Sequence, residues 1–274
     1  MYIFCIFEIC LYQFLQSTKA NRMSNNDIEY KIIEAEESIS DFVERFWMLT
    51  NHSDTEKEIV VIPDGRIDIF FSYSDTEPFH ITLMGLESEP TQTILPAKTV
   101  IFAVNLKLLA IEYLLNTSIS NILNGVHHLP TSFWKITKED LNDFDALCIK
   151  VTNKIKTLIP QEVDDRKQKL FNLIYSSHGS LSVTELSEKV FWSSRQINRY
   201  FNQMFGLSLK AYCNILRFRA SVHHIKEGIL FPEQNFTDQA HFIKEVKKLS
   251  GVTPKELFKN KNDRFLQFTT LPKK

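Results

Sequence analysis

The chain has 274 residues, 43% of them apolar, which excludes wholesale disorder and is enough for one large or two ordinary hydrophobic cores. Its formal net charge of −1 hides a strong asymmetry. Residues 1–165 hold 25 acidic and 13 basic side chains, a net −12, whereas residues 166–274 hold 8 acidic and 19 basic, a net +11. The basic half favours a polyanionic partner, with nucleic acid first and an anionic membrane second.

The four cysteines indicate neither disulfides nor a metal centre. Cys5, Cys10, Cys148 and Cys213 form no CxxC pair, and their spacing matches neither a disulfide framework nor a zinc site. The chain also lacks an HxH pattern with a later Glu and His, which a β-barrel metal site would need. We therefore predict a reducing, cytoplasmic environment, with no metal and no cofactor.

The first fifteen residues, MYIFCIFEICLYQFL, are almost entirely apolar. They are too few to span a membrane, which takes about 20 apolar residues, and they lack the basic start and the cleavage site of a signal peptide. The polar stretch that begins at Met23 is typical of the start of a soluble protein. We expect the natural start at Met23, residues 1–22 as an apolar leader outside the fold, and no membrane partner.

Residues 23–161 are predicted to form a β-rich domain. From Glu58 to Val104, apolar runs alternate with turn residues about every ten positions, which is typical of an antiparallel sandwich or barrel. Asp64 and Gly65 lie between two such runs and predict a hairpin. Asp64 and Asp68 could form an acid and base pair. A turn residue and a solvent-facing strand residue are the simpler interpretation, so we predict no catalytic site.

The spacing of apolar residues predicts a helix from Leu141 to Leu158, ended by Pro160. The following segment, QEVDDR, is polar and coincides with the change in charge sign. We place a domain boundary there. The predicted fold class is therefore α+β, with a β-rich regulatory domain at 23–161, an all-α domain at 166–264 and a tail at 265–274.

The basic half contains an internal repeat at an offset of 45 residues. Trp192–Tyr212, WSSRQINRYFNQMFGLSLKAY, aligns with Thr237–Leu257, TDQAHFIKEVKKLSGVTPKEL. Inward apolar positions, an outward cation (Arg199 and Lys244) and a terminal glycine recur in both. The repeat predicts two copies of one supersecondary unit, and chance similarity between two short helices is the alternative.

Capping signals divide the first copy into two short helices. Ser182 with Glu185 predicts the start of the first helix, and Ser193 with Gln196 predicts the start of the second. Gly206 predicts the end of the second helix. Two short helices joined by a tight turn form a helix-turn-helix in outline.

The outward face of the second helix carries Arg195, Asn198, Arg199 and Asn202 at three- and four-residue spacing. Arg can bind guanine, and Asn can bind adenine, through paired hydrogen bonds, so this face has the chemistry of major-groove readout. An ordinary solvated helix face is the alternative. The +11 charge and the repeat favour readout.

A long helix, Leu209–Lys226, is predicted to join the two copies. Its candidate phosphate contacts, which would orient the protein without reading sequence, are Arg217, Arg219 and Lys226. The second recognition helix is predicted to start at the N-cap Thr237 and to end at Gly251, and a closing helix follows from Thr253. The outward residues of the second recognition helix are Gln239, His241, Lys244 and Lys247. His241 is equally well interpreted as a packed surface histidine.

The motifs FNQMFGLSLKAY and NFTDQAHFIKEVKKLSGVTPKEL are similar to the closing signatures of AraC/XylS-type transcriptional regulators, whose DNA-binding domain carries two helix-turn-helix units. The resemblance covers roughly residues 170–262. It implies base-proximal roles for six residues: Arg195, Asn198, Arg199, Gln239, His241 and Lys244. The segments RFWMLTN and VIPDGRIDIFF resemble a β-rich N-terminal domain found on some members, most of them bacterial. That implies a sensing domain and transfers no ligand residues.

One segment departs from the family pattern. The repeat offset puts the first helix of the second unit on residues 227–235, EGILFPEQN, which contain Gly228 and Pro232. Proline inside a helix costs about 3 kcal/mol. We therefore predict that the second unit lacks a normal supporting helix and contributes less to DNA affinity than the first.

These features together predict a cytoplasmic transcription regulator that binds double-stranded DNA with two recognition helices in successive major-groove segments. The acidic N-terminal domain is expected to bind a small-molecule effector, a partner, or its own copy as a homodimer. Two other classes stay open: a β domain that binds or converts a small molecule beside an accessory basic domain, and an adaptor that uses DNA as an anchor. The sequence offers no combination of nucleophile, base and orienting group, so we do not expect an enzyme.

Overall fold

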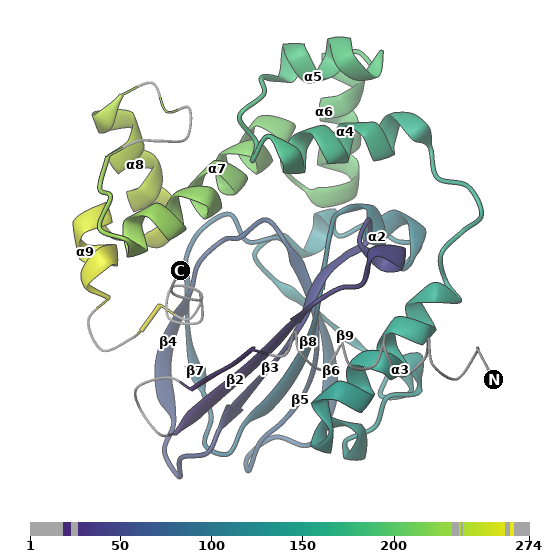
Figure 1. Ribbon diagram of the computed structural model, residues 1–274, viewed down its shortest axis with the longest axis vertical. Helices are drawn as coiled ribbons and strands as arrows, with labels where there is room; N and C mark the ends of the chain where they lie inside the picture. Colours follow the sequence, from purple (N-terminus) through teal and green to yellow (C-terminus); the bar gives the residue numbers. More distant parts are fainter. Residues whose placement is uncertain (1–18, 23–26, 232–235, 237, 261–263, 266–274) are drawn as a thin grey trace, which may run out of the picture.

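The computed structural model describes residues 19–22, 27–231, 236, 238–260 and 264–265. It has the predicted α+β fold, a β-rich N-terminal domain followed by an all-helical C-terminal domain (Figure 1). Seven strands form one antiparallel sheet, in the spatial order β1 (Lys19–Arg22), β2 (Ile28–Glu34), β3 (Val43–Asn51), β8 (Val100–Leu106), β5 (Ile67–Tyr73), β6 (His80–Met84) and β9 (Val126–Leu129). A second, two-stranded antiparallel sheet consists of β4 (Lys57–Val61) and β7 (Thr91–Leu95). The connections contain α2 (Leu109–Tyr113) and the 3-10 helices η1 (Glu37–Ile39), η2 (Ser120–Ile122), η3 (Phe133–Lys135) and η4 (Glu139–Asn142).

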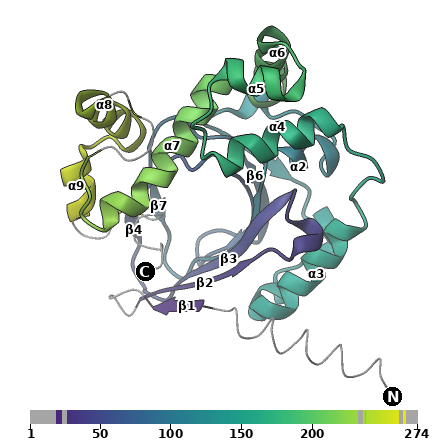
Figure 2. The ribbon, with the colours of Figure 1, turned by 45° about the horizontal axis from the view of Figure 1, so that its top comes forward.

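The two faces of the large sheet have different roles, because side chains alternate between the faces along each strand. Phe46, Phe71 and Phe102 are buried on one face. Helix α3 (Phe144–Lys156) covers them, with the rings of Phe102 and Phe144 6.1 Å apart. The residues at alternate positions of the same strands point to the opposite face, toward β4 and β7. In Figure 2 the strands curve around the space between the two sheets.

The hairpin predicted at Asp64 and Gly65 is wrong. Strand β4 pairs with β7, whereas β5 pairs with β6 and β8, so the chain passes from one sheet to the other at this turn. The turn itself is present: Gly65 has φ +71°, and the Arg66 amide donates to Asp64 Oδ1 at 2.8 Å. The Gly65 carbonyl accepts a hydrogen bond from Tyr212 Oη at 2.8 Å. A helix of the C-terminal domain therefore holds this turn, which has no hairpin partner.

Two other predicted segments differ in detail. Of the apolar leader, residues 19–22 form β1, which pairs antiparallel with β2, and residues 1–18 lie outside the described part of the chain. The helix predicted from residue 141 is divided, because η4 ends at Asn142 and α3 begins after the N-cap Asp143. The Asp143 side chain accepts a hydrogen bond from the Ala146 amide at 3.0 Å, which fixes the start of α3.

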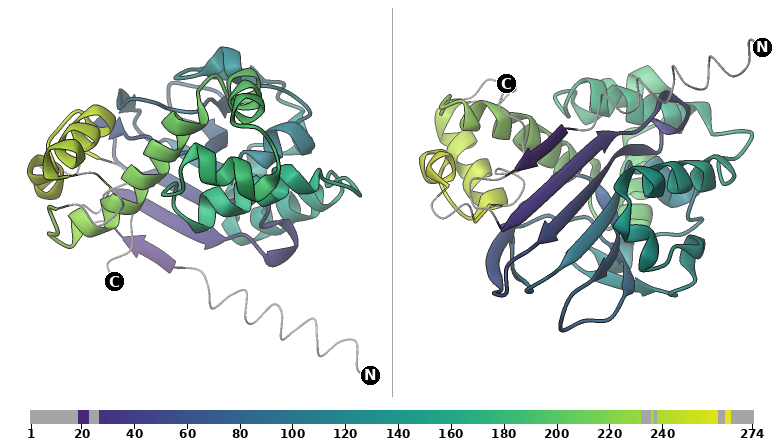
Figure 3. Two further views of the ribbon diagram at one scale, coloured as in Figure 1. Left: turned by 90° about the horizontal axis from the view of Figure 1, so that it is seen from above. Right: turned by 60° about the horizontal axis from the view of Figure 1, so that its bottom comes forward.

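The helical domain contains α4 (Asp165–Ser176), α5 (Val183–Val190), α6 (Ser194–Phe205), α7 (Leu209–Lys226), α8 (Gln239–Ser250) and α9 (Pro254–Lys259). Helices α4 to α6 gather at one end of α7, and α8 and α9 lie at its other end (Figures 1 and 3). One hydrophobic core extends through both domains and includes Phe102 of the sheet, Phe171 of α4 and Tyr212 of α7. The helical domain therefore packs directly on the β-rich domain.

Candidate nucleic-acid interface and adjoining cavity

Helices α5 and α6 form the predicted helix-turn-helix. Both predicted capping boxes are present, Ser182 with Glu185 and Ser193 with Gln196. Phe191 makes the turn between the helices in a left-handed conformation, with φ 52°. Gly206, with φ +78°, ends α6 as predicted. The sequence determined these helix limits because caps are local interactions.

The outward face of α6 presents two arginines. Arg195 and Arg199 are exposed, and neither has a hydrogen-bond or ion-pair partner among the described residues. Asn202 is exposed, and its Nδ2 donates to the Asn198 carbonyl at 2.7 Å. Asn198 is only half-exposed: its Nδ2 donates to the Ser194 carbonyl at 3.0 Å, and its Oδ1 accepts from the Leu209 amide at 3.3 Å. The amide of Asn198 is thus engaged within the protein, whereas the two guanidinium groups face solvent.

The second unit repeats the first at the predicted offset. Helix α8 spans 239–250 and ends at Gly251, with φ +76°, and these positions lie 45 residues after α6 and its terminal glycine. The N-cap is Asp238, which accepts from the His241 amide at 2.8 Å. The predicted N-cap, Thr237, is therefore wrong by one residue, and Thr237 itself lies outside the described residues. The closing helix α9 starts with the predicted capping box of Thr253 and Glu256.

The outward residues of α8 differ in exposure and in their contacts within the protein. Lys244 and Lys247 are exposed, and neither has a hydrogen-bond or ion-pair partner among the described residues. Gln239 is exposed and donates to the Leu230 carbonyl at 2.9 Å. His241 is half-buried, with its ring 5.8 Å from that of Phe236.

The segment before α8 differs from the supporting helix α5 of the first unit. Residues 227–231 contain no helix, and Gly228 has φ +85°. Residues 232–235, which include Pro232, lie outside the described residues. In the described part of this segment the second unit therefore lacks a helix at the position that α5 occupies in the first.

The three candidate phosphate contacts on α7 have different surroundings. Arg219 points toward the β-rich domain, where its Nη2 donates to Glu44 Oε2 at 2.7 Å. Arg217 is half-buried, with its guanidinium 5.8 Å from the centre of the Phe236 ring. Lys226 is half-buried and is the last residue of α7.

Glu44 links the two domains through arginines. It accepts from Arg66 Nε at 2.8 Å and from Arg219 Nη2 at 2.7 Å, and Arg45 Nη2 lies 3.4 Å away. Burial alone would raise the pKa of Glu44, but the charges of these arginines hold that pKa far below its usual range. Glu44 is therefore ionised at neutral pH and joins α7 to β3 and to the turn before β5.

A second contact between the domains lies at the end of the first recognition helix. Ile119 donates its amide to the Met204 carbonyl at 2.9 Å, and Ser118 Oγ donates to the Gln203 carbonyl at 2.7 Å. These carbonyls belong to the last turn of α6, where helices lack internal donors. The loop before η2 thus supplies the hydrogen bonds that complete α6.

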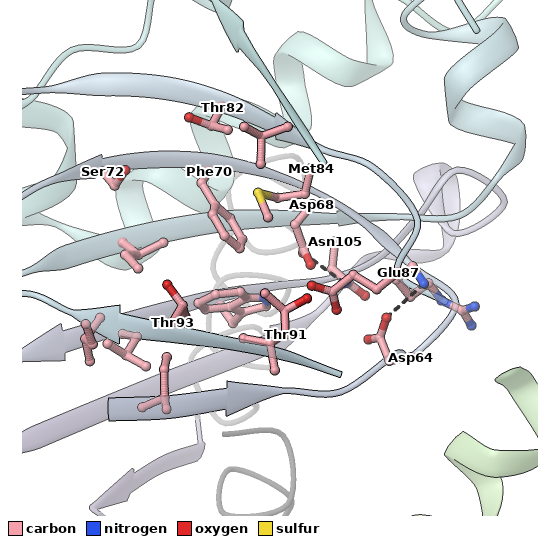
Figure 4. A pocket seen from close by; sticks show the side chains of 18 of the residues that line it. Asp64, Asp68, Phe70, Ser72, Thr82, Met84, Glu87, Thr91, Thr93 and Asn105 are labelled. Carbon is pink, nitrogen blue, oxygen red and sulfur yellow. Dashed lines mark hydrogen bonds between the residues drawn. The ribbon is translucent and has the colours of Figure 1, made fainter. Parts of the chain in front are cut away.

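A cavity of about 610 Å³ lies between the two sheets and extends to α7. Alternate residues of the strands line it: Arg45, Trp47 and Leu49 of β3, Asp68, Phe70 and Ser72 of β5, His80, Thr82 and Met84 of β6, and Thr91, Thr93 and Leu95 of β7. Helix α7 contributes Arg219, Val222 and His223 (Figure 4 shows part of the lining). This volume is typical of small-molecule sites.

Asp68 lines this cavity, so its predicted position on the open solvent side of a strand is wrong. The strand alternation was correct, but alternation alone does not distinguish solvent from an internal cavity. The sequence did contain a sign of a cavity. In RFWML and RIDIFFS, every second residue forms a set that mixes polar with aromatic side chains, which differs from the uniformly polar set of a solvent-facing strand. Among the described residues, no group of His, Cys, Asp or Glu side chains is placed to hold a metal ion.

The family model of DUF6597, a domain of unknown function, matches residues 31–145, within the β-rich domain. No curated protein matches the chain. A structure of ToxT from Vibrio cholerae is 13% identical, with 78% of this chain and 98% of ToxT covered and a TM-score of 0.43. ToxT from Vibrio cholerae O395 bound to (E)-4-(8-methylnaphthalen-1-yl)but-3-enoic acid is 13% identical, with 78% and 98% covered and a TM-score of 0.44. Likeness at this level defines no function.

Proposed function

We propose that the protein is a bacterial, cytoplasmic transcription regulator of the AraC type, which binds specific double-stranded DNA sequences and is not an enzyme. One observation carries the proposal: the same capped helix with a terminal glycine occurs twice, 45 residues apart, with an exposed cation at the equivalent positions Arg199 and Lys244. A repeated, outward, cationic helix face suits the major groove, where Arg reads guanine.

Helix α7 sets the separation of the two recognition helices. It has 18 residues, and a rise of 1.5 Å per residue makes it about 27 Å long. Paired recognition helices that enter successive major-groove segments are about 34 Å apart. Because α6 and α8 lie at opposite ends of α7, their spacing is compatible with that geometry. In this proposal Arg195 and Arg199 contact bases first, and Lys244 and Lys247 do so in the second groove segment.

The β-rich domain is proposed to sense a small molecule in its cavity. Arg219, Val222 and His223 of α7 line that cavity together with the strands, so an occupant would contact the helix that joins the two DNA-binding units. The Glu44 bridge and the loop before η2 would then carry the change to α7 and α6. This requires two states of the domain contact that differ in affinity for the occupant.

Selection of bound sequences from a random DNA pool with the full-length protein tests the proposal. An enriched motif is expected, and Arg199→Ala should weaken binding to it by about tenfold or more, because a bidentate contact to guanine contributes about 1–3 kcal/mol. Lys150→Ala is the matched control, because it removes one positive charge from α3, far along the chain from both units. A pool without enrichment would contradict sequence-specific binding.

A second function is supported by the cavity alone: a β domain that binds or converts a small molecule, with the basic domain as an accessory. In that function, the acidic residues that line the cavity would have to catalyse the conversion. This alternative predicts turnover of a small molecule, or ligand binding without any effect on DNA binding, and DNA binding without sequence preference. The same selection experiment therefore distinguishes the two functions.

A further inference from the structure

Three carboxyl groups gather at one end of the cavity. The side chains of Asp64, Asp68 and Glu87 lie close together there, from the turn after β4, from β5 and from the segment after β6 (Figure 4). None of the three forms an ion pair with a basic group of the described residues. This end of the cavity therefore holds three acidic groups, none of which has an ion-pair partner among the described residues.

A buried amide at the same place lacks a donor. Asn105 is only 3% exposed, and its Nδ2 donates to Asp68 Oδ1 at 2.9 Å. Its Oδ1 is buried and has no hydrogen-bond partner among the described residues, and Asn105 is one of the residues that line the cavity. An unpaired buried oxygen is destabilising, and an N–H group of a ligand would satisfy it. This oxygen indicates a ligand that donates hydrogen bonds.

The electrostatics of the three acids favour a positive ligand. Burial, followed by the nearby charge of Asp64, raises the pKa of Asp68 to about 7. Burial, followed by the charges of Asp64 and Asp68, raises the pKa of Glu87 to about 8. A cation between these groups would stabilise their ionised forms, because an opposite charge nearby favours the charged state.

The rest of the lining suits an apolar body. Trp47 and Phe70 form an edge-to-face pair with ring centres 5.4 Å apart, and the ring of Tyr30 lies 5.9 Å from that of Trp47. All three residues line the cavity. Aromatic faces pack against apolar groups and also attract cations.

The arginines of the lining do not reverse this preference. Arg45, Arg66 and Arg219 all lie against Glu44, at 3.4, 2.8 and 2.7 Å, and the charge of Arg45 also acts on Asp64 and Asp68. The three arginines share Glu44 as an ion-pair partner. Glu87, by contrast, forms no ion pair with a basic residue of the described part of the chain. The described side chains also provide no metal-binding group, so an organic cation fits better than a metal ion.

We propose that the cavity binds an organic cation, with an ammonium group between Asp64, Asp68 and Glu87 and an aromatic or aliphatic body against Trp47 and Phe70. The three N–H donors of the ammonium group are shared among these carboxyl groups and Asn105 Oδ1. The ligand class is inferred from the residues that line the cavity. Its role as an effector rests on the proposed function, because α7 lines the same cavity.

Calorimetric titration of the full-length protein with three indole compounds tests the ligand class. Tryptamine carries an ammonium group, tryptophol a neutral hydroxyl and indole-3-propanoate a carboxylate, while the indole body is constant. Tryptamine is expected to bind at least about tenfold more tightly than tryptophol, because hydrogen bonds to charged groups are stronger than neutral ones. The carboxylate is expected to bind most weakly. Equal affinities, preference for the carboxylate, or no binding of tryptamine at millimolar concentration would overturn the proposal.

Variants assign the binding to the acidic end of the cavity. Asp68→Asn keeps an oxygen for the Asn105 amide and removes a buried charge, so the variant should fold, which its unfolding midpoint checks. It should weaken tryptamine binding by about tenfold and leave tryptophol binding unchanged. Glu87→Gln should act in the same direction. Asp75→Asn, an exposed position outside the cavity, should change neither affinity. Unchanged tryptamine affinity in both cavity variants contradicts the assignment.

DNA binding separates this inference from the proposed function. Arg199→Ala is expected to lose DNA affinity and to keep tryptamine affinity, because α6 does not line the cavity. Specific DNA binding without tryptamine binding would overturn only the ligand class. Tryptamine binding without specific DNA binding would overturn only the regulator function.

Discussion

Removal of the charge at Glu44 should destabilise the protein more than removal of any exposed acidic partner. Its side chain is 18% exposed, and it faces Arg66, whose side chain is only 5% exposed. In Glu44→Gln, the guanidinium of Arg66 stays buried without a counter-charge, and the bond from Arg219 loses its ionic partner. Breaking a buried ion pair by removing one partner costs about 3–5 kcal/mol. Some of the charge is solvent-screened, so we expect about 3 kcal/mol.

Urea unfolding of wild type and variant, followed by tryptophan fluorescence, measures this difference. Asp54→Asn is the matched control, since Asp54 also pairs with a basic residue, Lys98, but its side chain is 90% exposed. The control should change the free energy of unfolding little. If Glu44→Gln unfolds at the same urea concentration as wild type, the bridge between α7 and the β-rich domain does not stabilise the fold.

The lowered pKa of Glu44 also predicts how the difference in unfolding free energy between wild type and Glu44→Gln depends on pH. The pKa of Glu44 is lowered in the folded state from its usual 4.5, so its contribution is present above about pH 4.5 and is lost as the pH falls below that value. The stability gap between wild type and Glu44→Gln should therefore narrow on acidification. A gap that widens at low pH would contradict the assigned ionisation.

Three further outcomes are expected. Arg199→Ala should weaken specific DNA binding more than Lys244→Ala in gel-shift titrations, because residues 227–231 form no helix that supports α8; the reverse order would contradict the ranking. The DNA association constant should fall with salt by about 0.9 log units per contacted phosphate for each log unit of salt, and a flat response would exclude phosphate-driven binding. Asp68 and Glu87 have raised pKa values in the folded state, about 7 and about 8, so the folded state holds protons that the unfolded chain has released. The free energy of unfolding should therefore decrease as the pH rises from about 4 to about 8, with a smaller decrease in Asp68→Asn, and equal slopes would contradict the two raised values.

Contacts between residues that are near each other in the sequence were predictable. Capping boxes at Ser182, Ser193 and Thr253 and the glycine stop at Gly206 fix the limits of the helices, because each involves residues at most a few positions apart. The repeat with its offset of 45 residues likewise recurs in the structure, since equal local signals form equal helices. The exposed arginines of α6 follow from the same periodicity.

The tertiary structure alone decided which partners meet across the chain. Strand pairing is non-local, so the turn at Gly65 could not reveal that β4 and β5 belong to different sheets. The same alternation places a side chain in solvent or in a cavity, and only the second sheet turns the face that carries Asp68 into an enclosed site. Arg219 had the spacing of a phosphate contact, yet it meets Glu44, 175 positions earlier in the chain. Local signals determine helices, but the lining of a cavity depends on how separate elements pack, which no short window of sequence contains.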